Sequence, residues 1–421
     1  MARIVHVTEF SKGGIETHLN ELLIRQSGRH DIYLIAAQQD EAARTLRVAP
    51  DRLLLYPYRR HPLAMLQALL HIRRLLRRLA PDIVHVHGTF AGLFVRLALP
   101  PGGRRPRVVY CAHGWSFLMD TAPWKRRLYG LAERLLALRT DRVINISANE
   151  HRAALRIGIP AAKSSVIYNG ISGQEKAENP AARGDAGPEP GSEPGTLSGA
   201  TEEAGTGDTA SAPAVAAADF LGERLPSKPP PIRLLYIGRF DRQKGFDVLM
   251  DTFRGADFPG VSLQLVGDAV LGGLACDIPD GVTRLGWVPN AEIGRCIDAC
   301  DALVVPSRWE GFGIVAIEAL RGGKPVIASN RGALPEIVAH GETGYLFDFD
   351  RPEQLAAIIR GLDKRALAEM APACRAAFAA RFHAERMLAG IERLYADTLA
   401  RRPRRRAGRA GWEAGHERGG V

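Results

Sequence analysis

The segment 306–320 constrains the fold of this chain more than any other stretch. It reads Pro-Ser-Arg-Trp-Glu-Gly-Phe-Gly-Ile-Val-Ala-Ile-Glu-Ala-Leu. The apolar run at 300–305 is rich in valine and stops at Pro306, which is typical of a short buried parallel strand. Residues 314–320 follow a helical apolar pattern, and the glycine pair at 322–323 supplies a stop. We therefore expect a strand, a glycine-rich turn and a helix.

A helix that starts at this turn offers a site for an anion. Its unpaired backbone N–H groups and the positive end of its dipole point at whatever lies above the carboxyl edge of the sheet, which suits a phosphate. Gly311 and Gly313 let the backbone approach a ligand closely. Glu310 lies in the turn and Glu318 about one turn into the helix, so they reach different parts of one bound molecule. Taken alone, both carboxylates also fit an ordinary solvated helix start.

The spacing of these two carboxylates resembles a family signature. With Gly-Phe-Gly between them, Glu310 and Glu318 match the Glu-x7-Glu pattern of the retaining, GT-B-fold glycosyltransferases of family 4. The resemblance implies an α/β fold of two Rossmann-like, doubly wound domains facing a central cleft. It implies a nucleotide-diphosphate sugar as donor and a carbohydrate or lipid-linked acceptor. It further implies transfer with retention of configuration, without a metal and without a cofactor other than the donor.

The rest of the chain repeats the strand-and-helix pattern on which this fold depends. Apolar strands followed by turns recur through the first half and restart at 232–238, so doubly wound α/β architecture is expected. We predict an N-terminal acceptor domain over 1–171 and a C-terminal donor domain over 232–400. The intervening 172–231 is rich in Gly, Ala, Pro and Glu and has too few large apolar residues to fold, so we expect a disordered insertion. Residues 401–421 are expected to form a disordered basic tail.

The turn after the strand 232–238 carries two cations. Gly238 and Arg239 precede Lys244 and Gly245, an arrangement that places both cations over the next helix start and suits a diphosphate. Read without the family, Arg239 and Lys244 are surface charges. The resemblance implies that Gly238, Arg239 and Lys244 hold the leaving diphosphate, so that no metal is required.

The same resemblance assigns roles around the segment 306–320. Glu310 and the backbone of Phe312, Gly313 and Ile314 would hold hydroxyls of the transferred sugar. Glu318 would hold the ribose hydroxyls, because a carboxylate accepts two hydrogen bonds from neighbouring hydroxyls.

Two features of the first half complete the candidate site. Gly13 and Gly14 follow the first strand, and the family places such a turn near the transferred sugar, although an ordinary strand-to-helix turn explains it equally. His113 follows a strand at its carboxyl edge and is either a satisfied core residue or, as the family implies, the histidine that orients or stabilises the sugar. We interpret His85 and His87 as structural.

Other potential metal ligands are explained without a metal. The Asp348-Phe349-Asp350 sequence follows the closing strand, so a turn with a helix cap is expected. Cys296 and Cys300 lie one helical turn apart, but no further pair of ligands lies near them in the sequence, so we expect core thiols.

The composition indicates a cytoplasmic protein, because the chain lacks a long apolar run and its first residues are too polar for a signal peptide. The formal net charge is +10. Arginines at 73, 74, 77 and 78 give the helix expected at 63–79 a basic face. Taken singly, each arginine fits an ordinary solvated helix face. We interpret their clustering as favouring an anionic membrane surface, on the inner face of the plasma membrane, and not nucleic acid. Polysaccharide or glycolipid biosynthesis is the expected role.

Two alternative functions stay open. A nucleotide-sugar epimerase shares the fold class and would convert the donor alone. A non-catalytic binding protein would use its basic helix and tail. Since no residue stands out as a covalent nucleophile, we expect attack from the face that the leaving phosphate vacates.

Overall fold

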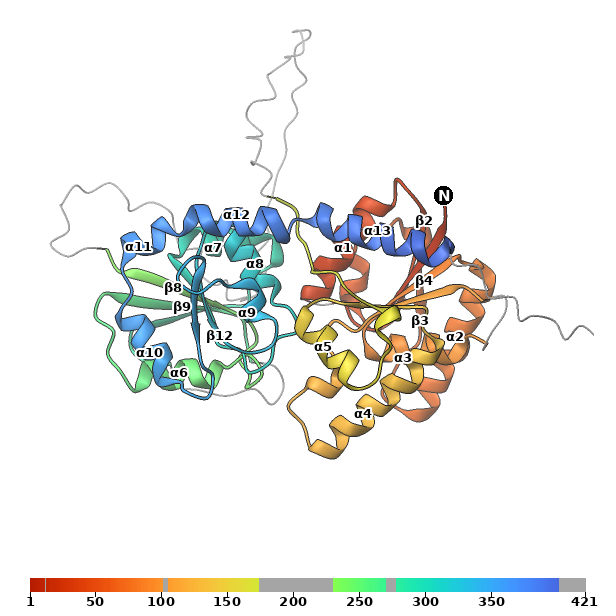
Figure 1. Cartoon of the computed structure of the whole chain (residues 1–421), viewed down its shortest axis with the longest axis horizontal. Coiled ribbons are helices and arrows are strands. Elements are labelled where there is room, and N and C mark those ends of the chain that lie inside the picture. The colour runs from red at the N-terminus through yellow and green to blue at the C-terminus, as the bar shows by residue number, and fades with distance from the viewer. Residues whose placement is uncertain (12, 101–104, 174–229, 270–277, 401–421) are drawn as a thin grey trace, which may run out of the picture. The chain divides into compact units, whose positions relative to one another are not determined.

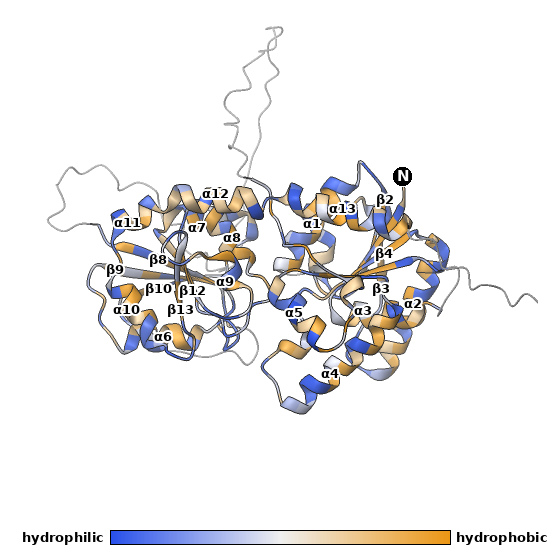
Figure 2. Ribbon diagram, in the orientation of Figure 1, coloured by the Kyte–Doolittle hydropathy of each residue, from blue (hydrophilic) through white to orange (hydrophobic). Residues whose placement is uncertain are grey.

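The structure, a computed structural model, describes residues 1–11, 13–100, 105–173, 230–269 and 278–400. Two parallel sheets, each with helices on its faces, make up the described chain (Figure 1). This is the expected pair of doubly wound, Rossmann-like folds. The strands are mostly hydrophobic, whereas the surrounding helices are hydrophobic on one side and hydrophilic on the other (Figure 2).

The first sheet has seven strands in the order β3-β2-β1-β4-β5-β6-β7, and all of its pairs are parallel. The order reverses direction between β1 and β4, so these two central strands border the switch point at which doubly wound sheets bind ligands. The strands are β1 (Arg3–Thr8), β2 (Asp31–Ala37), β3 (Leu53–Tyr56), β4 (Ile83–His87), β5 (Arg107–Cys111), β6 (Arg142–Asn145) and β7 (Ser164–Val166). The helices that connect them are α1 (Gly14–Gln26), α2 (Pro62–Leu79), α3 (Thr89–Ala98), α4 (Pro123–Leu136) and α5 (Ala148–Arg156).

The second sheet has six strands in the order β10-β9-β8-β11-β12-β13, again all parallel, with its reversal between β8 and β11. Its strands are β8 (Ile232–Ile237), β9 (Val261–Val266), β10 (Val282–Gly286), β11 (Ala302–Val305), β12 (Val326–Ser329) and β13 (Gly344–Phe347). Its helices are α6 (Phe246–Arg254), α7 (Ile293–Ala299), α8 (Ile314–Arg321), α9 (Leu334–Ile337), α10 (Glu353–Arg360), α11 (Lys364–Glu369) and α12 (Ala371–Arg381). The expected strand, glycine turn and helix of the 306–320 region are β11, its loop and α8.

The last helix, α13 (Ala384–Ala400), packs on the first sheet, as the sequence predicts. Its first backbone N–H donates to Ile171 O at 2.9 Å. Further along, the Tyr395 hydroxyl lies 2.6 Å from His85 Nδ1 on β4. The end of the described chain therefore contributes side chains to the core of its beginning.

After β7 the chain leaves the sheet at Val166, and Ile171 forms an isolated bridge with His383. One local prediction is wrong in detail. The Asp-x-Asp sequence does form a turn but caps no helix. Asp348 accepts hydrogen bonds from Asp350 N at 3.1 Å and Asn330 Nδ2 at 3.2 Å, while the residue before α10 is Pro352, which has no side-chain acceptor.

The remaining predictions on the fold concern segments and cysteines. The insertion falls almost wholly, and the tail wholly, outside the described residues, as does Cys276. Cys111, Cys300 and Cys374 are buried free thiols, as a core role requires, whereas Cys296 is partly exposed and packs against the core. No described helix has the length and apolar character needed to cross a bilayer.

Candidate active site

An ion pair between Lys244 and Glu310 lies at the carboxyl ends of the two central strands of the second sheet. Lys244 Nζ donates to Glu310 Oε2 at 2.6 Å, and Ser307 Oγ donates to the same oxygen at 3.2 Å. The loop after β8 supplies the lysine, and the loop after β11 supplies the serine and the glutamate. The glutamate is buried and the lysine partly exposed, so the pair has one face toward solvent.

Arg239 lies in the same loop as Lys244 but faces the surface. Its guanidinium pairs with Asp241 at 3.1 Å and donates to Gln243 Oε1 at 2.9 Å, and half of its side chain is exposed. The other oxygen of Asp241 accepts the Lys244 backbone N–H at 2.9 Å. The loop thus carries Lys244, which contacts Glu310, and Arg239, which faces solvent, and Asp241 contacts both residues.

Glycines allow the loops after β8, β9 and β11 to approach one another. Gly245 has φ +68°, and a β-carbon there would lie 1.8 Å from the carbonyl oxygen of Pro306. A β-carbon on Gly267 would lie 1.9 Å from the carbonyl oxygen of Gly238. No side chain fits at either position, because the obstructing atom belongs to the backbone.

The N-terminus of α8 opens beside the ion pair. Its capping residue, Gly313, has φ +98° and no side chain to satisfy the first N–H groups of the helix. Glu318, partly exposed, lies further along α8, and burial raises the pKa of its carboxyl to about 7 although Arg321 opposes the shift. The Phe312 ring packs against Tyr168 and Phe382, with ring centres 6.1 and 5.9 Å away, so only its backbone can face a ligand.

Two turns of the first sheet meet this region. A β-carbon on Gly14 would lie 3.1 Å from Ile314 Cγ1, and one on Gly311 would lie 3.6 Å from the carbonyl oxygen of His113. Gly13 caps α1 with φ +68°. His113 has φ +53°, which is rare outside glycine and sets its ring at the edge of the sheet.

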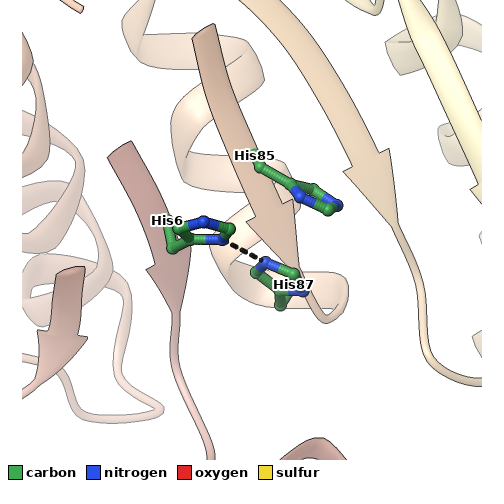
Figure 3. A group of neighbouring side chains, drawn as sticks. All are labelled: His6, His85 and His87. Carbon is green, nitrogen blue, oxygen red and sulfur yellow. Dashed lines mark hydrogen bonds between the residues drawn. The ribbon is translucent and has the colours of Figure 1, made fainter. Parts of the chain in front are cut away.

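His113, in the loop after β5, belongs to a group of histidines whose side chains pack ring against ring. The other members lie on β1 (His6), on α1 (His18) and on β4 (His85 and His87). His6 Nδ1 lies 3.0 Å from His87 Nε2, as Figure 3 shows, and His87 Nδ1 lies 2.9 Å from His113 Nε2. The register of the sheet explains the grouping, because His6 on β1 is the direct neighbour of His85 on β4. The sequence analysis interprets His85 and His87 as structural but does not identify His6 and His18 as their neighbours.

The partners of this chain of rings determine where its protons lie. Gln26 Nε2 donates to Glu392 Oε1 at 2.9 Å, which leaves its amide oxygen 3.0 Å from His6 Nε2. An amide oxygen only accepts, so His6 carries its proton on Nε2 and accepts at Nδ1. His87 must then donate from Nε2 to His6 and accept at Nδ1. His113 in turn donates from its Nε2 to His87 Nδ1. His113 is left with an unprotonated Nδ1.

All of these rings are neutral near pH 7. Burial lowers the pKa of His6 to about 4 and that of His113 to about 3. Burial likewise lowers the pKa of His18, His85 and His87 well below the ordinary value, and repulsion from other rings of the group adds to the effect. Each ring therefore has one donor and one acceptor, as the chain of hydrogen bonds requires.

Residues 219–372 match the protein family "Glycosyl transferases group 1", and residues 12–174 match the family "Glycosyltransferase Family 4". The chain is a GT-B glycosyltransferase of family 4.

A relative of similar length is the "Uncharacterized 41.2 kDa protein in cps region" of Klebsiella pneumoniae, which is 29% identical over 93% of this chain and 99% of its own. The D-inositol 3-phosphate glycosyltransferase of Segniliparus rotundus is 36% identical over 30% of this chain and 31% of its own length. Among solved structures, Anabaena HepE in complex with UDP and glucose superposes with a TM-score of 0.69 at 20% identity, covering 94% of this chain and all of HepE. Sucrose-phosphate synthase from Thermosynechococcus elongatus also gives 0.69 at 19% identity, over 95% of this chain and all of its own.

In this glycosyltransferase most of the sequence-predicted site residues fall near one another. Lys244 touches Glu310, the loop before α8 borders His113, and Gly14 borders Ile314. The outward Arg239 is the exception, since its guanidinium binds Asp241 and not Glu310.

The histidine group also offers two sets of nitrogens that could hold a metal ion. The ring nitrogens of His6, His85 and His87 lie within 4.8 Å of one another, and so do those of His18, His87 and His113. Three imidazoles suit zinc or a similar borderline cation. A hydrogen bond lies within each set, however: His6 bonds to His87 in the first and His87 to His113 in the second. In each bond a proton occupies the place between two nitrogens that a metal would take.

Proposed function

We propose that this glycosyltransferase moves a sugar from a nucleotide-diphosphate sugar to a carbohydrate or lipid-linked acceptor, with retention of configuration and without a metal. The Lys244–Glu310 pair beside the open N-terminus of α8 carries this proposal. It combines a cation for the diphosphate with a carboxylate for sugar hydroxyls at one point.

Entry of the donor would exchange the partners of this pair. In the free enzyme Lys244 and Glu310 neutralise each other at 2.6 Å. A bound diphosphate would take over Lys244, assisted by the helix start and by Arg239 once that side chain turns from Asp241. Glu310 would then be free to accept hydrogen bonds from the sugar, and Glu318 from the ribose.

In the reaction, the bond between the anomeric carbon and the phosphate oxygen breaks. The acceptor oxygen bonds to the same face of that carbon and passes its proton to the leaving phosphate. Lys244 and Arg239 stabilise the negative charge that develops on the diphosphate. Glu310, the backbone at 312–314 and His113 orient the sugar, with the turn at Gly13 and Gly14 on its other side. The unprotonated Nδ1 of His113 would accept a hydrogen bond from a sugar hydroxyl.

The comparisons suggest which donor to try first. HepE has been crystallised with UDP and with UDP-glucose, so UDP-glucose is the first donor for assay. The relative of similar length is named for a cps region, which supports a role in bacterial polysaccharide assembly. We place that role in the cytoplasm, at the inner face of the plasma membrane.

Thermal-shift titration with UDP, GDP and ADP in chelator, on the wild type and on Lys244→Ala, tests the donor site. One nucleotide should raise the melting temperature in proportion to RT ln(1 + [L]/Kd), and the substitution should weaken the effect. Product analysis with the matching sugar nucleotide then separates the alternatives. Conversion of the donor alone would indicate an epimerase, and binding without consumption would indicate a non-catalytic protein.

A further inference from the structure

Helix α4 of the first sheet exposes a row of large apolar side chains. Their exposed fractions are 63% for Trp124, 54% for Leu128, 53% for Leu131 and 56% for Leu135. At about 100° per residue these four positions fall within an arc of about 60° on the helix surface. Leu138, in the 3-10 turn that follows, continues the row with 74% exposed.

Cations flank this row on both sides. Lys125, Arg127 and Arg134 are exposed, and among the described residues none of them pairs with an acidic group. The one acidic residue of α4, Glu133, faces inward and is neutralised by Arg96 at 2.8 Å. The outer surface of α4 is therefore apolar along its centre and positive along its edges.

A groove runs along the base of the same helix. Its volume is about 640 Å³, and α4, the 3-10 turn at 116–118 and α5 line it. Leu118, Leu131 and Ile157 supply apolar wall, and Gly130 leaves room between the elements. Four arginines surround it (Arg126, Arg127, Arg134 and Arg156). Such a lining fits an anionic group attached to an apolar chain.

We infer that this face of α4 docks the enzyme on an anionic lipid bilayer, with the groove receiving a phosphate-bearing lipid headgroup. An apolar row with cationic edges is the pattern of a helix that lies in a membrane interface, with Trp124 at headgroup depth. Nucleic acid would pair with the cations but would leave the apolar row exposed to water. Helix α2 carries the basic face noted in the sequence, but its exposed leucines, such as Leu63 and Leu66, lie near its start and its arginines near its end.

This inference rests on the proposed function only in placing a lipid-linked acceptor at the bilayer. Binding to vesicles can be measured without any turnover of donor, so the two can be tested separately. The experiment is co-sedimentation of the full chain with vesicles of phosphatidylglycerol and phosphatidylcholine, and with phosphatidylcholine alone. We expect binding to the anionic vesicles that weakens as salt rises.

Two variants of α4 test the surface. Leu128→Gln with Leu135→Gln, and Lys125→Glu with Arg127→Glu, should each weaken partition onto anionic vesicles by about ten-fold or more. The matched control is Leu66→Gln with Leu70→Gln on α2, which also replaces exposed leucines and should bind normally. Unchanged circular dichroism and UDP-induced thermal shift would show that all three remain folded.

Three outcomes would overturn the inference. They are absence of wild-type binding to anionic vesicles, an equal loss in the α2 control, and self-association that the α4 leucine variant abolishes without vesicle binding. A blue shift of tryptophan fluorescence on anionic vesicles that disappears in Trp124→Phe would support it independently. Failure of donor turnover with intact vesicle binding would count against the proposed reaction alone.

Discussion

His87 Nδ1 and His113 Nε2 lie 2.9 Å apart, and this bond connects the histidine proposed to face the sugar with a carboxylate on the last helix. The connection passes from Glu392 through the amide of Gln26 to His6, His87 and His113. Because each member donates in the same direction, the charge of Glu392 fixes the tautomer of a ring four partners away.

Replacing Glu392 should therefore change His113. In Glu392→Gln the new amide can donate as well as accept, so the orientation of Gln26 is no longer fixed. We expect His113 to populate both tautomers and kcat/KM for the donor to fall about two- to ten-fold. Spectra of protein labelled with nitrogen-15 in histidine report the protonation of each ring nitrogen directly.

Glu385→Gln is the matched control for this variant. It lies on the same helix and removes the Arg25 contact at 2.9 Å, outside the histidine chain. Its His113 signal should remain that of one tautomer. A single unchanged tautomer in Glu392→Gln would refute the relay, and so would stoichiometric zinc that shifts the signals of His6, His85 and His87 together.

Lys244 and Glu310 should act as a unit in the reaction. Lys244→Ala and Glu310→Ala are each expected to lower kcat/KM by about 100-fold or more, because one loses diphosphate stabilisation and the other a sugar contact. Thermal denaturation should show both folded. Normal rates in both variants would exclude the proposed site, and a double variant much less impaired than the product of the two would measure their coupling.

Donor affinity should depend on the ionisation of Glu318. Burial raises the pKa of this carboxyl to about 7, and the ionised form is the better acceptor for ribose hydroxyls. Affinity for the nucleotide should therefore rise with pH between about 6 and 8 and fall by up to about ten-fold per pH unit below 7. Calorimetric Kd values across this range should show the trend in the wild type. Glu318→Gln should bind more weakly with no such dependence, and an identical pH profile in it would assign the titration to another group.

The histidine group should make the fold sensitive to acid. An unfolded histidine binds a proton below its ordinary pKa of 6.5, whereas folded His6 resists protonation down to about pH 4 and His113 to about pH 3. Stability is therefore retained above pH 6.5 and lost below it, by up to about 1.4 kcal/mol per pH unit for each such ring. Urea unfolding at pH 7.5, 6 and 5 should show this loss, and His6→Gln should reduce the slope. A stability that is flat across the range would contradict the burial of neutral rings.

Gly245 should tolerate no side chain. Alanine there must accommodate both φ +68° and the Pro306 carbonyl oxygen, so we expect a loss of more than about 3 kcal/mol or failure to fold. Gly260 provides the control, because it has φ +79° with open space around it, and alanine there should cost about 1 kcal/mol. Denaturant midpoints of the two variants give the comparison, and equal losses would show that backbone conformation alone matters.

The sequence predicts the strand, turn and helix that carry Glu310 well because their signals are local. The strand, turn and helix around Glu310 lie within twenty residues, where an apolar run, a glycine-rich turn and a helical apolar pattern predict them one after another. The same holds for the turn between β8 and Lys244. The direction of Arg239 could not be predicted, since it depends on which carboxylate the folded loop brings near.

The histidine chain escaped prediction because its members lie far apart in sequence. His6 and His87 are 81 residues apart and meet only because β1 and β4 are neighbours in a particular register. Gln26 and Glu392 are separated by 366 residues. The exposure of the apolar row on α4 could not be predicted for another reason, since a helix pattern shows that an apolar side exists but not which sides neighbouring elements cover.

The packing of α13 on the first sheet also bears on how the chain is made. Glu392 and Tyr395 reach partners on α1 and β4 that a ribosome synthesises more than 300 residues earlier. Until α13 has left the exit tunnel, His85 and Gln26 lack their partners. The side of the first sheet that α13 covers is then still exposed. The N-terminal half must therefore wait, incompletely closed, through the synthesis of the entire donor-binding half. A nascent chain stalled before residue 384 should be the form that chaperones and proteases recognise.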